Sequence, residues 1–65
     1  RARLFAQLAA SLVEGGHLLV AEPKVHVTKR AFEETLRIAA DEGLSVVERP
    51  RVGLSRAALL VRRSE

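Results

Sequence analysis

Residues 15–23 read Gly-Gly-His-Leu-Leu-Val-Ala-Glu-Pro, a short apolar run with two glycines before it and Glu-Pro after it. A continuous apolar run of this length is typical of a strand that is buried on both faces of a sheet. Pro23 disfavours a helical conformation at Glu22, so the run ends there. We therefore predict a strand over residues 17–22.

A helix is predicted on each side of this strand. The first spans residues 1–14 and ends at the two glycines, because a glycine just past the last periodic residue is a common helix stop. The second spans residues 29–42, with Thr28 as its N-cap and Gly43 at its end. The apolar positions are Leu4, Phe5, Leu8 and Leu12 in the first helix and Phe32, Leu36, Ala39 and Ala40 in the second. Both helices are therefore amphipathic, and the apolar stripe of each needs a sheet against which to pack.

Two further strands follow the second helix. Residues 44–49 are typical of a strand that ends at Pro50, which cannot donate a hydrogen bond to a neighbouring strand. Residues 55–62 are predicted to form the last strand, although their Ala-Ala-Leu-Leu centre is also compatible with a helix.

The order of these elements favours one topology. The strands 17–22 and 44–49, joined by a helix, should be parallel with a right-handed crossover. Only about five residues lead into the last strand, a length that suits an antiparallel return. The sequence therefore predicts an α/β fold in the order helix-strand-helix-strand-strand. Its three-stranded mixed sheet has the order 17–22, 55–62, 44–49, with the last strand antiparallel and central.

The apolar pattern exceeds what two helices can cover. The chain has 65 residues and no Cys, so it makes one small domain without disulfides. Both 18–21 and 57–61 lack a polar face, which implies layers above and below the sheet. Helices on one face would leave the other face, and one edge of strand 17–22, uncovered; helices on opposite faces are the alternative. Because the chain also begins at Arg1 rather than Met, we expect residues 1–65 to be a partial domain, completed by further sequence or by a second copy.

The stretch Leu12-Val13-Glu14-Gly15-Gly16-His17-Leu18-Leu19-Val20-Ala21-Glu22-Pro23 resembles a known family passage. It is similar to L-x-P-G-G-x-L-L-V-x-E-P, which leads into the fifth strand of class I, Rossmann-like S-adenosylmethionine-dependent methyltransferases. Glu14 stands where that family commonly has Pro. Further likenesses to one bacterial branch are His26-Val27-Thr28 with Phe32, Leu36, Ala39 and Gly43, and Pro50 followed by Ser55-Arg56-Ala57-Ala58-Leu59.

This resemblance implies the C-terminal portion of a Rossmann-like methyltransferase fold. The parent enzyme would use S-adenosylmethionine, held by a Gly-rich loop and an acidic residue that lie before Arg1. The four glycines of this chain show no G-x-G spacing, so no cofactor-binding residue is assigned here. We expect the segment alone to bind no cofactor and to transfer no methyl group.

Two residues are candidates for contact with the methyl acceptor, because ligands of α/β sheets gather at the carboxyl ends of parallel strands. These are Glu22 and His26, which could bind substrate or act as a general base. The structural interpretation is favoured for both: Glu22 would accept backbone N–H groups, and His26 would be exposed or capping. Two ligands are too few for a metal site, and none is predicted.

Other polar residues receive no catalytic role. His17 opens its strand at the opposite end from the expected site, so a structural role is predicted. Ser11 and Ser55 lack a His and Asp at recognisable motif spacing, so no nucleophile is assigned.

The charge distribution suggests one further class of partner. Residues 1–47 contain six basic and six acidic groups, so the net charge of +3 comes from residues 48–65. The arginines there are Arg49, Arg51, Arg56, Arg62 and Arg63. Such a cluster can contact nucleic-acid phosphates, but the chain has no Tyr or Trp on which bases could stack. We favour a solvated rim of arginines that resists aggregation at strand edges.

Three functional hypotheses result. The leading one is the C-terminal segment of a methyltransferase, which completes the sheet and forms one wall of the acceptor site. The alternatives are a small self-associating α/β interaction module and, with least support, a basic nucleic-acid-binding module. No apolar run approaches the roughly 20 residues of a membrane span and no signal peptide is recognisable, so a cytoplasmic location is expected.

Overall fold

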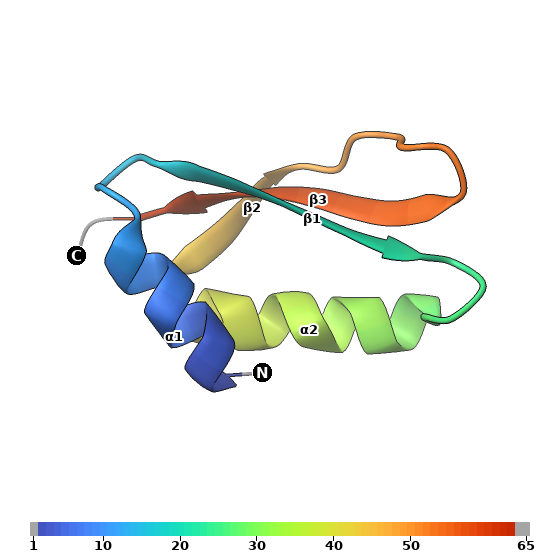
Figure 1. Ribbon diagram of the computed structural model, residues 1–65, viewed down its shortest axis with the longest axis horizontal. Helices are drawn as coiled ribbons and strands as arrows, with labels where there is room; N and C mark the ends of the chain where they lie inside the picture. Colours follow the sequence, from blue (N-terminus) through green and yellow to red (C-terminus); the bar gives the residue numbers. More distant parts are fainter. Residues whose placement is uncertain (1, 64–65) are drawn as a thin grey trace.

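The structure is a computed structural model, and it describes residues 2–63. In chain order, its elements are α1 (Ala2–Ser11), β1 (His17–Pro23), α2 (Lys29–Asp41), β2 (Leu44–Glu48) and β3 (Ser55–Arg62) (Figure 1). This is the predicted order of helices and strands, and residues 55–62 form a strand rather than a helix.

The three strands form one sheet in the order β1-β3-β2. β3 is antiparallel to both neighbours, so β1 and β2 run parallel to each other on either side of it. The β1-β3 register pairs His17 with Val61 and continues without a break to Pro23 and Ser55. The prediction that the last strand is central and antiparallel is therefore confirmed. The prediction of a mixed sheet is wrong, because β3 separates the two parallel strands and both hydrogen-bonded pairs are antiparallel.

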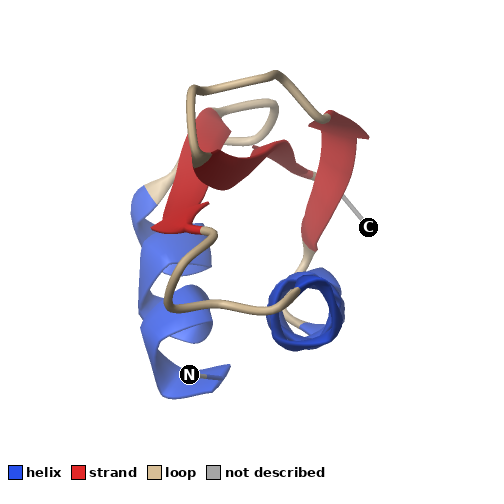
Figure 2. Ribbon diagram, turned by 90° about the vertical axis from the view of Figure 1, so that its right-hand side faces the viewer, coloured by secondary structure: helices blue, strands red, loops and turns tan. Residues whose placement is uncertain are grey.

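Both helices lie on the same side of the sheet, which leaves the other side without a second layer (Figures 1 and 2). The core fills the space between the helices and the sheet. It consists of Phe5, Ala9, Phe32, Leu36, Ala39, Leu44, Ala58 and Leu60. Leu44 and Leu60 are the largest side chains that are fully buried. The alternative with helices on opposite faces is thus wrong.

The end of α1 differs from the prediction. The helix ends at Ser11 instead of residue 14, although the Leu12 N–H still donates to the Leu8 carbonyl at 3.2 Å. The chain then makes a separate turn, closed by the Gly16 N–H and the Val13 carbonyl at 2.8 Å. Gly15 has a φ of +82° in this turn, a conformation that glycine adopts without steric cost. The glycine pair therefore shapes the entry to β1 and does not cap the helix.

α2 begins as predicted. The Thr28 hydroxyl oxygen accepts a hydrogen bond from the Ala31 N–H at 3.1 Å, which satisfies one of the free donors of the first turn. The buried stripe, however, contains Thr35 in place of Ala40, which is exposed. The Thr35 hydroxyl donates to the Ala31 carbonyl at 3.1 Å, so this polar side chain is buried with its hydrogen bond made within the helix.

A β-bulge interrupts β2. Val46 pairs with Leu60 and Glu48 pairs with Leu59, so Val47 is an extra residue on this strand. Such a bulge changes which side chains face each side of the sheet. In regular alternation from the buried Leu44, residue 48 would face the helices. With the bulge, Arg49 does so instead and reaches α2.

The side of the sheet without helices carries mostly apolar side chains. We call it the open face and define it by Leu19, Ala21, Val47, Ala57, Leu59 and Val61. In the register of β1 and β3, Leu19 lies opposite Leu59 and Ala21 opposite Ala57. Leu19 is 54% exposed and Val47 is 51% exposed. The sequence pattern thus places more apolar residues on the sheet than this arrangement buries.

Candidate functional site

The carboxyl end of β1 meets the beginning of β3 at one end of the sheet. The Lys24 N–H donates to the Leu54 carbonyl at 2.9 Å, which joins the end of β1 to the loop before β3. Two further N–H groups, of His26 and Val27, donate to the Pro23 carbonyl at 3.1 and 3.0 Å. These bonds fold residues 24–27 into a compact turn that leads directly into α2.

The two predicted site residues lie at this end of the sheet. Glu22 is half-buried on the side of β1 that faces the helices, directly opposite Arg56 in the strand register. His26 is exposed in the turn. Exposure of His26 is compatible with both interpretations of this residue, and contact of either residue with a substrate stays a prediction.

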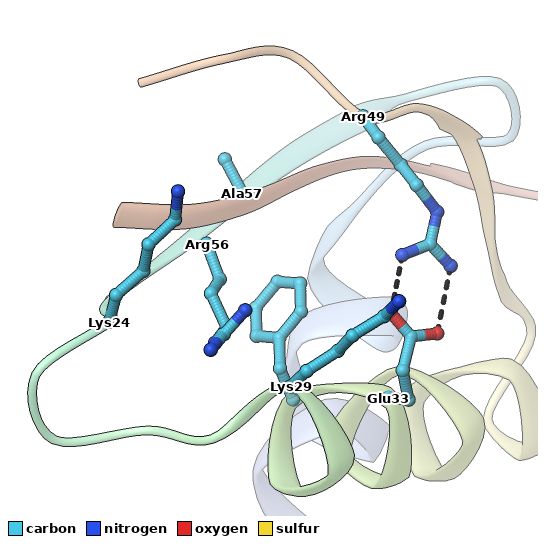
Figure 3. Close-up of a pocket in the computed structure, with 7 residues that line it drawn as sticks. Lys24, Lys29, Glu33, Arg49, Arg56 and Ala57 are labelled. Carbon is cyan, nitrogen blue, oxygen red and sulfur yellow. Dashed lines mark hydrogen bonds and ion pairs between the residues drawn. The ribbon is translucent and has the colours of Figure 1, made fainter. Parts of the chain in front are cut away.

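A pocket of about 170 Å³ opens between α2 and the beginning of β3 at the same end of the sheet (Figure 3). It is lined by Lys24, Lys29, Phe32, Glu33, Arg49, Arg56 and Ala57. Four of these residues are basic and one is acidic, and we therefore call it the cationic pocket. Its basic residues come from the turn after β1, the start of α2, the residue after β2, and β3.

Arg49 and Glu33 form a two-bonded ion pair on one wall of the pocket (Figure 3). The Arg49 guanidinium donates to the two carboxylate oxygens of Glu33 at 2.5 and 3.0 Å. The hydrogen bond from Arg49 lowers the pKa of the Glu33 carboxyl, and the charges of Arg49 and Lys29 lower it further. The same hydrogen bond raises the pKa of Arg49. The β2 bulge makes this pair possible, because it turns Arg49 toward α2.

Arg56 and Arg62 occupy the two ends of the helix-facing row of β3. The Nε of Arg56 donates to the Val27 carbonyl, just before α2, at 2.7 Å. At the other end, Arg62 donates to the Leu12 carbonyl, just after α1. Both side chains are part-buried. They therefore hold the loops next to the two helices, and the prediction of a solvated rim is wrong for these two arginines.

The C-terminal arginines do not form one continuous patch. Arg56 and Arg62 are six residues apart on β3, which places them roughly 20 Å apart at about 3.4 Å per residue. Arg63 continues beyond Arg62, whereas Arg49 and Arg51 precede β3. The positive charge is thus divided between the two ends of the sheet.

The other polar residues considered from the sequence lie elsewhere or act locally. His17 is exposed at the first position of β1, the end farthest from the cationic pocket. The Ser11 hydroxyl donates to the Gln7 carbonyl at 2.9 Å within α1. Within residues 2–63, no three His, Cys, Asp or Glu side chains are grouped as metal ligands. In the same range, neither helix is both long and apolar enough to cross a bilayer.

Comparisons with protein-family models, with curated proteins and with solved structures gave no match. The chemistry of the site therefore has to be inferred from its own residues.

The sequence reasoning missed the cationic pocket, although part of the signal was present. Lys24 follows β1 and Arg49 follows β2, and these strands were predicted to be parallel. The carboxyl ends of parallel strands meet at the same edge of a sheet, so both cations could have been placed together. The direction of the Arg49 side chain could not, because it depends on the bulge.

Proposed function

We propose that this chain is the C-terminal segment of a class I S-adenosylmethionine-dependent methyltransferase domain. In that role it completes the sheet and forms one wall of the methyl-acceptor site. The observation that carries the proposal is the strand order β1-β3-β2, in which the last strand is inserted antiparallel between two parallel strands. The resemblance at residues 12–23 adds that β1 would be the fifth strand of that fold.

The open face supports the proposal. Apolar residues on both faces of a strand are typical of a sheet that is covered on both sides. Leu19 and Val47 are each about half exposed, and within residues 2–63 no strand pairs with the outer edge of β1. In the proposed parent domain, another strand would pair with this edge and further helices would cover the open face.

The position of the candidate residues also fits an acceptor site. Glu22, His26 and the cationic pocket lie at the carboxyl end of β1, the edge where α/β enzymes bind ligands. The cofactor would be held by other parts of the parent enzyme, because no G-x-G stretch occurs in this chain. We therefore assign no catalytic activity to residues 1–65 alone, and a cytoplasmic location stays an expectation.

The second candidate function is a self-associating α/β interaction module. Its support is the same open face, which a second copy of the chain could cover in place of a parent domain. A nucleic-acid-binding module has less support, because the arginines of residues 49–63 are divided between the two ends of the sheet.

The experiment that tests the proposal uses the protein produced from the complete reading frame that encodes this chain. We expect this protein to bind S-adenosylmethionine in calorimetry and to transfer a labelled methyl group, and residues 1–65 alone to do neither. Absence of cofactor binding by the whole product, or micromolar binding by residues 1–65, would contradict the proposal. Sedimentation of residues 1–65 as a stable dimer, with a whole product that binds no cofactor, would favour the interaction module.

A matched pair of histidines tests the predicted role of the β1 edge. In the whole product, we expect His26→Ala to lower kcat/KM for the methyl acceptor while the affinity for S-adenosylmethionine is unchanged. His17→Ala is the control, because this histidine is also exposed on the same segment but lies at the opposite end of β1. Equal losses for the two variants would argue against an acceptor wall at residues 22–26.

A further inference from the structure

The cationic pocket concentrates like charges. Lys24, Lys29, Arg49 and Arg56 surround one small volume, and Glu33 is the single acidic residue in its lining. Glu22 lies nearby, opposite Arg56 in the register, so cations outnumber carboxylates by four to two even when it is counted. Cations that share a site repel each other, and a cleft lined by one sign of charge attracts the opposite sign. The arrangement therefore favours an anion in the pocket.

Two of the four cations are held in position by bonds of their own. Arg49 is fixed by both carboxylate oxygens of Glu33, and the Nε of Arg56 is fixed by the Val27 carbonyl. A guanidinium has five N–H donors, so these bonds orient each group without using all of its donors. A ligand would thus meet donors that are already oriented, and binding would cost less conformational entropy.

The two lysines and the N-terminus of α2 add to the positive potential of the cationic pocket. Lys29 is the first residue of the 13-residue helix α2, whose N-terminus carries a partial positive charge. Lys24 lies in the turn after β1, on the opposite side of the pocket from Arg49 (Figure 3), and both lysines are exposed. Exposed ammonium groups can move to meet an oxyanion, and a phosphate or carboxylate pairs well with both lysine and arginine.

The size and the remaining lining narrow the class of ligand. A volume of about 170 Å³ is smaller than that of a typical drug-sized site, so it suits a single charged group. Phe32 and Ala57 also line the pocket, but they are only 3% and 8% exposed, so they offer little free apolar surface. An organic molecule could therefore place its oxyanion among the cations while its carbon skeleton extends toward solvent.

We propose that the cationic pocket binds the oxyanion group, phosphate or carboxylate, of a small organic molecule. This binding needs no methyl donor, so it goes beyond the proposed methyltransferase function and can be tested separately from it. If that function also holds, the pocket lies at the same strand edge as the acceptor wall, and the anion would belong to the methyl acceptor.

The test measures anion binding to the product of the complete reading frame by calorimetry, without S-adenosylmethionine and at constant ionic strength. The probes are inorganic phosphate, phenyl phosphate and benzoate, which separate a phosphate from a carboxylate preference. We expect saturable binding of phenyl phosphate or benzoate. Lys24→Gln and Lys29→Gln should each weaken it by roughly fivefold and together by at least about tenfold, with unchanged thermal unfolding.

Arg30→Gln is the matched control. Arg30 is the next residue of α2, is also exposed and carries the same charge, but it does not line the cationic pocket. We expect Arg30→Gln to change the affinity by less than about twofold. Glu33→Gln should tighten binding, because it removes the acidic residue of the lining but keeps an oxygen that can accept from Arg49.

Three results would overturn the proposal. The first is no saturable binding of any of the three anions. The second is an equal loss of affinity in Lys29→Gln and Arg30→Gln, which would indicate a diffuse charge effect. The third is binding of an oligonucleotide that Lys29→Gln and Arg63→Gln weaken equally, because Arg63 lies beyond the far end of β3.

Discussion

The two faces of the sheet have similar side chains and opposite surroundings. Leu60 and Leu59 are neighbours on β3, yet Leu60 faces the helices and is 0% exposed while Leu59 lies on the open face and is only partly buried. The β1 partners are apolar on both faces, Leu18 opposite Leu60 and Leu19 opposite Leu59, whereas on β2 Leu60 pairs with Val46 and Leu59 with Glu48. Between β1 and β3, composition therefore does not distinguish the covered face from the open one; the packing of the helices does.

This difference shows that the open face carries apolar surface whose burial would stabilise the fold but which residues 2–63 leave uncovered. Burial of apolar surface contributes about 25 cal/mol per Å², so a covered Leu59 and Leu19 would add stability that the open face lacks. Contiguous apolar surface of this kind usually marks a site of contact with another segment or another molecule. Substitutions on one face, or in the elements that hold it, test this difference when each is compared with a matched position.

The largest effect is expected on the covered face. Leu60→Ala should lower the free energy of unfolding by about 3 kcal/mol, because it removes fully buried methyl groups and leaves a cavity. Leu59→Ala, the same change one residue earlier, should lower it by less, about 1–2 kcal/mol, in residues 1–65 alone, because Leu59 is only partly buried there. Urea unfolding followed by circular dichroism measures both.

The same pair of variants tests whether the open face is covered in the complete product. In the complete product, the loss of unfolding free energy caused by Leu59→Ala should rise toward that caused by Leu60→Ala, because truncation of a covered Leu59 would also leave a cavity. If Leu59→Ala lowers the free energy of unfolding no more in the complete product than in residues 1–65 alone, the open face is not covered by a parent domain. Equal costs in the isolated chain would instead mean that a second copy already covers this face.

The fold was predictable where local signals agreed with the global arrangement. Thr28 indicated the start of α2, because threonine is a common N-cap. The short connection before residues 55–62 indicated that β3 runs antiparallel to β2. Three features were not predictable. The helix stripe includes Thr35 because its hydroxyl bonds within the helix, and α1 ends at Ser11 because the chain must turn toward β1.

The third unpredicted feature is the β2 bulge, and it affects the candidate site directly. The sequence alone gives no sign that Val47 is an extra residue in the pairing of β2 with β3. Regular alternation would turn Arg49 toward the open face. The cationic pocket was missed for this reason, whereas Glu22 and His26 could be located from the rule for strand ends.

The second prediction concerns the end of the covered face next to α1. Arg62→Met should lower the free energy of unfolding by about 1–2 kcal/mol, because it removes a charged donor from the part-buried Leu12 carbonyl. Arg63→Met is the matched control, since Arg63 is exposed, and it should change stability by less than about 0.5 kcal/mol. Equal unfolding midpoints in urea for Arg62→Met and Arg63→Met would show that the hydrogen bond to Leu12 contributes no stability.

The third prediction concerns the helix that supplies most of the covering layer. Thr28→Ala should cost about 1 kcal/mol, because the Ala31 N–H loses its acceptor at the start of α2. Ser11→Ala removes a hydroxyl at the end of α1 that bonds only to the preceding turn, and it should change stability by a few tenths of a kcal/mol. Thermal unfolding of the two variants provides the comparison, and a larger loss for Ser11→Ala would contradict this account of α2.

The smallest effect is expected at the Glu33–Arg49 pair, which links α2 to the end of β2. The pKa of Glu33 is lower in the folded chain than its ordinary value of about 4.3, so the unfolded chain binds a proton more readily as the pH falls. The pair therefore stabilises the fold fully above the unfolded pKa, and this contribution is lost as the pH falls through the lowered, folded value.

Both side chains of this pair are substantially exposed, 52% for Arg49 and 42% for Glu33, so solvent screening limits the contribution to about 0.5 kcal/mol or less. The urea midpoint of unfolding should differ between pH 7 and pH 3, and Glu33→Gln should remove the share of that difference that comes from the Glu33–Arg49 pair. In the unmodified chain, 1 M NaCl should reduce the same share, because salt screens exposed pairs. If Glu33→Gln leaves the pH dependence unchanged, the Glu33–Arg49 pair contributes no measurable stability to the fold.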